Sequence, residues 1–123
     1  MNANFQQGED QKLSVLVIEN GSPVDVSACA NIKAILKVGG VEQKKYALVA
    51  ETDHGTLLVD NTNNNQVNIF VTRDESKLFT AGSISIVLVC PFVDTSFPGN
   101  VRHQEYKFNV GRIIEGEAKD LTI

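Results

Sequence analysis

The chain has 123 residues, which is the length of one domain and enough to bury a substantial core. Its formal net charge is −4 and its basic residues are scattered, which argues against a nucleic-acid-binding role that would need clustered Lys and Arg. The sequence contains neither a signal peptide pattern nor an apolar run of the ~18 residues that a membrane span needs. We therefore expect a soluble protein made in the cytosol.

The N-terminal part of the chain contains a polar stretch followed by a strong turn signal. Residues 1–11 are mostly polar, which predicts a flexible N-terminal arm with Phe5 as a candidate docking residue. The segment from Glu19 to Ala28 lies between two apolar runs and contains Asn20-Gly21, followed closely by Pro23. Asn and Gly accept positive φ, and Pro fixes a φ that suits turns, so this segment predicts a tight turn between strands.

Alternating apolar residues and turn signals predict the strands that follow. Gly39-Gly40 interrupts one alternating run in a position suited to a hairpin turn. The only helical pattern is residues 73–79, with Thr72 or Asp74 as the N-cap. The run 83–90 is apolar on both faces and predicts a central strand. The expected strands span residues 12–19, 32–38, 44–50, 56–59, 66–72, 83–90 and 101–110.

These elements predict an all-β fold. Seven or eight short strands, with turn signals every ten residues or so and one short helical turn, are typical of an antiparallel β-sandwich. We expect a single sandwich domain over residues 12–110. Residues 111–123 are expected to form a C-terminal edge strand or a linker.

Four residues could supply soft metal ligands, namely Cys29, His54, Cys90 and His103. Structural zinc sites usually pair their ligands a few residues apart, and none of these four has such a neighbour. We therefore expect no metal site and separate surface histidines. The cysteines are expected to be buried, reduced thiols, and a Cys29–Cys90 disulfide is the alternative.

The polar loop after residue 59 partly imitates a calcium-binding loop. Asp60, Thr62 and Asn64 match its first ligand positions, but Asn65 replaces the required glycine and Val71 replaces the terminal glutamate. One carboxylate is too little charge, so the pattern predicts a plain hairpin loop. The sequence also has no nucleophile-elbow motif and no glycine-rich phosphate loop. We therefore expect a protein without enzymatic activity and without a cofactor.

The connection from Pro91 to Asn100 is the best candidate for contact with a partner. Phe92 and Phe97 are large apolar residues in a segment otherwise made of turn formers. Either both cover an open end of the sandwich, or at least one anchors a protein interface. The candidate interface residues are therefore Phe5, Phe92 and Phe97.

Three markers in order along the chain carry a resemblance to a known family. The segment Asn20–Ala28 is similar to the pattern "dG-x-PvDLsga", and Asp53-His54-Gly55 is similar to a "D-x-G" turn before a strand. Ala81-Gly82, which follows the short helical piece, is similar to the "aG" that leads into the penultimate strand; Ser85 departs from the aromatic residue often found after it. Over residues 12–110 the chain resembles the N-terminal immunoglobulin-like sandwich of phage baseplate upper proteins and related tail-fibre and head-fibre proteins.

This resemblance implies a non-enzymatic virion structural protein, made in the host cytoplasm, that acts in particle assembly or attachment. The implied partners are other virion proteins and further copies of the chain, with a trimer favoured, and neither nucleic acid nor membrane. No site residues follow from the resemblance, because its motif residues are structural. Two alternatives stay open: a carbohydrate- or protein-binding sandwich module, and a small cytosolic immunity or inhibitor protein.

Overall fold

The computed structural model describes residues 3–121, and these are mostly strands. Eight strands form one continuous sheet in the order β1-β10-β9-β5-β6-β7-β8-β2, and β3 and β4 form a separate two-stranded hairpin. The strands are β1 (Ala3–Gln6), β2 (Gln11–Leu16), β3 (Ile18–Glu19), β4 (Ser22–Pro23), β5 (Lys33–Val38), β6 (Val41–Ala47), β7 (His54–Val59), β8 (Gln66–Val71), β9 (Gly82–Val93) and β10 (Val101–Ile114).

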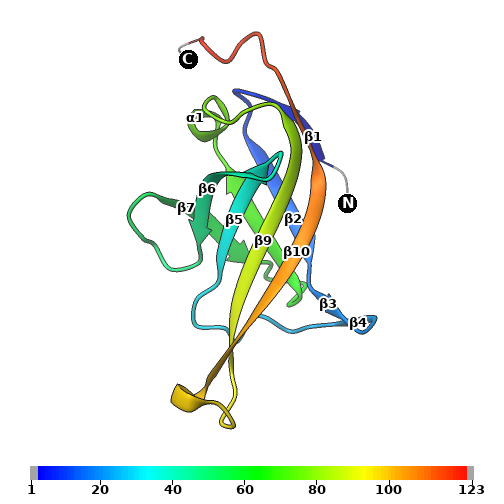
Figure 1. The fold of residues 1–123 in the computed structure, drawn as a ribbon, viewed down its shortest axis with the longest axis vertical. Helices are drawn as coiled ribbons and strands as arrows, with labels where there is room; N and C mark the ends of the chain where they lie inside the picture. Colours follow the sequence, from blue (N-terminus) through cyan, green and yellow to red (C-terminus); the bar gives the residue numbers. More distant parts are fainter. Residues whose placement is uncertain (1–2, 122–123) are drawn as a thin grey trace.

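The sheet turns over between β6 and β7, so that its two halves face each other as a sandwich (Figure 1). The strands β10-β9-β5-β6 form one layer, and β7-β8-β2 form the other. The β6–β7 pairing at the turn is parallel and covers only three residue pairs. In chain order, this is the connectivity of a variable-type immunoglobulin sandwich, in which strands G, F, C and C′ pack against D, E and B. The predicted immunoglobulin-like β-sandwich is therefore confirmed.

The core lies between the two layers. It is formed by every second side chain along each strand, the one that points inward. The predicted central strand is confirmed, because β9 lies between β10 and β5. The largest fully buried side chains come from both layers and include Leu13, Leu36, Tyr46, Leu57, Ile69, Ile84, Ile86, Leu88 and Ile113.

The N-terminal segment is a strand, so the expectation of a flexible arm at residues 1–11 was wrong for the part that is described; Met1 and Asn2 lie outside it. β1 pairs in parallel with the end of β10, and Ala3 lies opposite Gly111. Polar Asn4 and Gln6 face out, while Phe5 faces in and is only 3% exposed. The four-residue alternation was too short to stand out among polar neighbours. Phe5 is a core residue, and its side chain is not available to a partner.

The strand expected over residues 12–19 is split in two. β2 ends at Leu16, and the buried Val17 donates its backbone N–H to the carbonyl of Asn65 at 2.8 Å before β3 begins. The tight turn predicted at Asn20-Gly21 is confirmed, since both residues have positive φ (52° and 78°). At the other end of the chain, residues 111–114 continue β10 instead of forming a new strand.

The helical piece is one turn, α1 (Arg73–Ser76), shorter than the predicted 73–79. Of the two predicted caps, Thr72 is the N-cap: its side chain accepts from the backbone N–H of Glu75, whose own side chain accepts from the backbone N–H of Thr72. The hydroxyl of the buried Tyr46 also donates to Glu75 at 2.8 Å, which ties α1 to β6. Across residues 3–121, no helix is long and apolar enough to span a membrane.

Candidate protein interface

The hairpin formed by β9 and β10 is longer than the sheet beside it. β5 pairs with β9 only as far as Val89, so from Cys90 to the turn β9 pairs with β10 alone. Residues 91–103, which we call the hairpin arm, project beyond the end of the sandwich (Figure 1). Pro91, Phe92 and Val93, which the sequence placed in a loop, belong to strand β9. The outer face of the arm is therefore exposed to a partner, while Phe92 on its inner face packs against the core.

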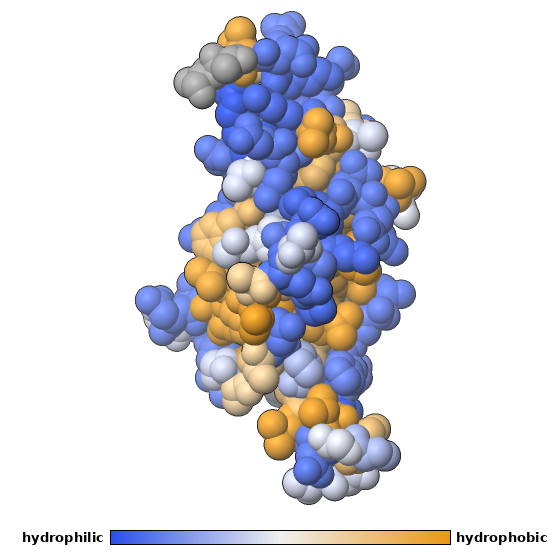
Figure 2. Space-filling model, turned by 90° about the vertical axis from the view of Figure 1, so that its left-hand side faces the viewer, coloured by the Kyte–Doolittle hydropathy of each residue, from blue (hydrophilic) through white to orange (hydrophobic). Residues whose placement is uncertain are grey.

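Apolar side chains gather at the end of the hairpin arm. Val93 is 78% exposed and lies opposite Val101, which is also exposed, on one face of the arm. Phe97 in the turn is 45% exposed. Figure 2 shows this apolar surface at the lower end of the molecule. Clustered exposed apolar groups at a protruding tip are typical of a protein interface.

The turn that presents Phe97 is held by local hydrogen bonds. The carboxylate of Asp94 accepts from the backbone N–H and the hydroxyl of Ser96, at 3.0 and 2.6 Å. The hydrogen bond from the Ser96 hydroxyl, and after it the one from the backbone N–H, holds the pKa of Asp94 below its usual range. The backbone N–H of Phe97 donates to the carbonyl of Asp94 at 3.2 Å, and Asn100 closes the turn with a positive φ of 60°. The position of Phe97 is thus fixed by the turn around it.

The other predicted aromatic residue, Phe92, supports the arm from its opposite face. Its ring is half-buried, and the guanidinium of Arg102 lies over it, 5.1 Å from the ring centre. Arg102 also pairs with Asp94 at 3.4 Å. These contacts link strand β10 to the turn and leave Phe97, not Phe92, as the aromatic side chain that the tip displays. The structure thus brings Phe92 and Phe97 together on the arm and separates them from the buried Phe5.

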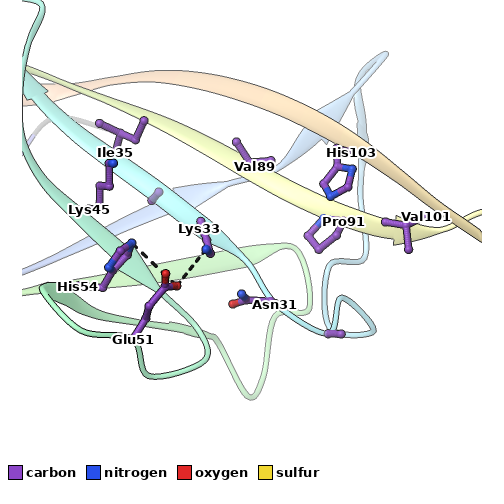
Figure 3. A pocket seen from close by; sticks show the side chains of 12 residues that line it. Asn31, Lys33, Ile35, Lys45, Glu51, His54, Val89, Pro91, Val101 and His103 are labelled. Carbon is purple, nitrogen blue, oxygen red and sulfur yellow. Dashed lines mark ion pairs between the residues drawn. The ribbon is translucent and has the colours of Figure 1, made fainter. Parts of the chain in front are cut away.

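A groove of about 690 Å³ lies at the base of the arm, on the outer face of the β10-β9-β5-β6 layer (Figure 3). Its floor is mostly apolar, with Ile35 from β5 and Val89 from β9. Its polar rim comes largely from strands β5, β6, β7 and β10 and from the loop between β6 and β7. The side chains that line it are those of Ala30, Asn31, Lys33, Ala34, Ile35, Lys45, Glu51, His54, Val89, Pro91, Val101 and His103.

One rim of the groove is organised around Glu51. Lys33 donates to its carboxylate at 2.9 Å, and His54 lies 4.0 Å from the same oxygen (Figure 3). The hydrogen bond from Lys33 holds the pKa of Glu51 below its usual range. Lys45 and His103 reach the groove without an ion pair to any other described residue. The groove therefore combines an apolar floor with a net positive rim.

The sequence did not reveal this groove. His54 and His103 were expected to be separate surface residues, but the fold places both on its lining. The strand register brings both histidines to the groove, because it sets His103 opposite Pro91 and His54 opposite Lys45. Register depends on pairing between distant segments, and no local pattern encodes it.

The remaining candidate ligands lie apart. Within residues 3–121, no three His, Cys, Asp or Glu side chains lie close enough together to hold a metal ion. Asp60 instead accepts from the backbone N–H groups of Thr62 and Asn63, as expected for a plain hairpin loop. Cys29 and Cys90 are free and buried. Burial raises the pKa of Cys90 to about 12, so its thiol is protonated at neutral pH and a poor nucleophile.

The comparisons with known proteins add little to this geometry. No protein-family model matches the chain, and no curated protein matches it. Among solved structures, the chain is similar to the V domain of amphioxus IgVJ-C2, with 13% sequence identity and a TM-score of 0.31, over 92% of this chain and 98% of that one. So weak a likeness carries no argument about ancestry or function. The chain is therefore classified by its architecture alone, which is an immunoglobulin-like β-sandwich.

Proposed function

We propose that the chain is a non-enzymatic protein-binding module that docks onto a larger assembly through its hairpin arm. The observation that carries this proposal is the arm itself, a two-stranded extension whose fixed turn displays Phe97 between exposed Val93 and Val101. A monomeric domain gains nothing from exposing these groups, whereas a partner that covers them gains apolar burial at a preorganised site.

The setting that we propose is a phage particle, in which the module serves as a baseplate, tail or head-fibre component. The three ordered sequence markers support this setting, and the fold has the architecture that they imply. Two of the markers also have structural roles: Asn20-Gly21 forms a hairpin turn, and Gly55 packs against the ring of Tyr46. We propose further that the other virion proteins are its partners, that it needs no cofactor, and that it contacts neither nucleic acid nor membrane.

The groove does not favour the carbohydrate-binding alternative. Sugar-binding sandwiches usually offer an aromatic platform for stacking, and the groove has no Phe, Tyr or Trp in its lining. The immunity-protein alternative finds no specific support in the fold. Protein binding at the arm remains the function that the geometry favours.

Replacing Phe97 with serine is expected to reduce incorporation of the protein into phage particles at least tenfold, because it removes the apolar anchor from the tip. The matched control is Leu78→Ser, which removes an even more exposed apolar side chain (83%) near α1, at the other end of the sandwich. Both variants should keep the wild-type unfolding midpoint, since neither residue is buried.

The measurement is quantitative mass spectrometry of purified particles from the phage that carries the gene, complemented with each variant. Wild-type protein and Leu78→Ser should be incorporated equally. Particles that lack the wild-type protein, or a gene without neighbouring capsid, portal or tail genes, would refute the virion setting. Equal incorporation of Phe97→Ser would refute docking through the arm.

A further inference from the structure

Strand β10 has an edge that nothing in the described chain covers. One side of β10 pairs with β9 along its length, but on the other side β1 pairs only with Gly111 to Ile114. From Val101 to Val110, which we call the open edge, no hydrogen bond between residues 3–121 reaches the backbone groups that point away from β9. An unpaired edge of this length is a template for another strand.

The space beside the open edge is not filled by the second layer of the sandwich. A recess of about 490 Å³ separates β10 from β2 there. It is lined from one side by Lys107, Phe108, Asn109 and Val110, and from the other by Ser14, Val15, Leu16 and Ile18. The inward-facing Phe108, which lines this recess, is consequently only half-buried. The open edge is therefore accessible, and further apolar surface lies next to it.

The charges on the open edge complement those of a second copy. Glu105 and Lys107 are both exposed on the outer face, and neither forms an ion pair with another described residue. In an antiparallel pairing of two copies centred on Tyr106, Glu105 of each copy lies opposite Lys107 of the other. Moving the centre by one residue to either side places Glu105 opposite Glu105 or Lys107 opposite Lys107. Opposite charges directly across a ladder stabilise it, and like charges destabilise it.

The available length supports the same register. Tyr106 lies near the middle of the open edge, which ends at the hairpin turn on one side and at β1 on the other. Charged residues often protect an edge from pairing. Here, however, Arg102 is engaged by Asp94 and by the ring of Phe92, and the two free charges have opposite signs.

We propose that two copies of the chain pair through their open edges, antiparallel and centred on Tyr106, to form a two-fold symmetric dimer with one continuous sheet across the interface. A self-complementary patch of this kind gives an isologous interface. This inference goes beyond the proposed function, because it concerns contact between copies and does not involve the tip residue Phe97. It also replaces the trimer that the family resemblance favoured with a dimer.

A charge-swap series tests the register. Glu105→Lys and Lys107→Glu each turn two attractive contacts per dimer into two repulsive ones. Each should therefore raise the dissociation constant of the dimer at least tenfold at low salt. The double variant Glu105→Lys/Lys107→Glu restores both pairs with reversed signs and should recover the wild-type constant. Sedimentation velocity over a concentration series measures all four proteins, and their circular dichroism checks that each is folded.

A cysteine placed at the centre of the interface tests the same register by geometry. Tyr106→Cys should form an interchain disulfide under mild oxidation, because residues directly opposite in an antiparallel pair lie close enough to be bridged. The control is Thr56→Cys, an exposed residue on β7 that does not line the recess beside the open edge, and it should stay monomeric on a denaturing gel; the native cysteines are buried. A monomeric or trimeric wild-type protein, failure of the double variant to recover, or equal cross-linking of the control would overturn the inference. Since Phe97 is untouched, particle incorporation can succeed while dimer formation fails, so the two proposals can fail separately.

Discussion

Replacing Tyr46 with alanine is expected to lower the free energy of unfolding by about 3–5 kcal/mol, the largest stability effect of any single change proposed for this chain. The Tyr46 ring is fully buried and lies against Gly55 of β7, at the parallel pairing where the sheet turns over. Its removal leaves a cavity between the two layers and breaks the hydrogen bond to Glu75 that holds α1. Urea unfolding followed by circular dichroism measures the change.

Tyr46→Phe separates the two contributions. It keeps the ring and removes only the hydroxyl, so it should cost about 1.5–3 kcal/mol, the value of a hydrogen bond to a charged group. If the two variants unfold at the same urea concentration, burial of the Tyr46 ring between the two layers does not contribute to stability.

Replacing Gly111 with alanine is expected to release β1 from the sheet and to cost about 2–4 kcal/mol, combining backbone strain with a steric clash. Gly111 has a φ of 136°, which favours glycine, and it lies at the register shift in β10. A Cβ there would overlap the carbonyl group of Ala3. Hydrogen exchange of the backbone amides in β1 should therefore become fast in the variant, and Phe5 should become accessible.

Gly21→Ala is the control for the strain alone. Gly21 also has a positive φ (78°), but a Cβ there meets nothing within 4 Å. This variant should cost about 1 kcal/mol and leave hydrogen exchange in β1 unchanged. Slow exchange in β1 of Gly111→Ala would show that the N-terminal strand does not depend on close backbone approach at this glycine.

Local chemistry accounts for the parts of the fold that the sequence predicted. The strands β5, β8 and β9 alternate or run apolar over six residues or more, and the turns at Asn20-Gly21 and Gly39-Gly40 use residues that accept positive φ. The capping box at Thr72 is likewise encoded within four residues. In each case the physical cause lies within a few residues of the feature, so the pattern alone was sufficient.

The parts that the sequence did not predict depend on contacts between distant segments. β1 is stable only because Gly111, more than 100 residues away, lets its backbone approach. The groove forms only when the register of five strands and the loop before β7 bring Lys33, Glu51 and His103 to one face. Phe97 could be proposed from the sequence because an aromatic residue in a turn is unusual locally, and the structure shows that it is exposed. Phe5 was misassigned because its strand forms only by pairing with the distant β10.

We propose that the hairpin arm is the surface through which the protein binds its assembly. Site-specific photo-cross-linking tests it most directly, with a photoreactive phenylalanine analogue at position 97 and, as the control, at position 78. In purified particles, the probe at position 97 should cross-link to a virion protein in high yield, and the probe at position 78 should not. Cross-linking from position 78 alone, or from neither position in particles that contain the protein, would contradict the claim.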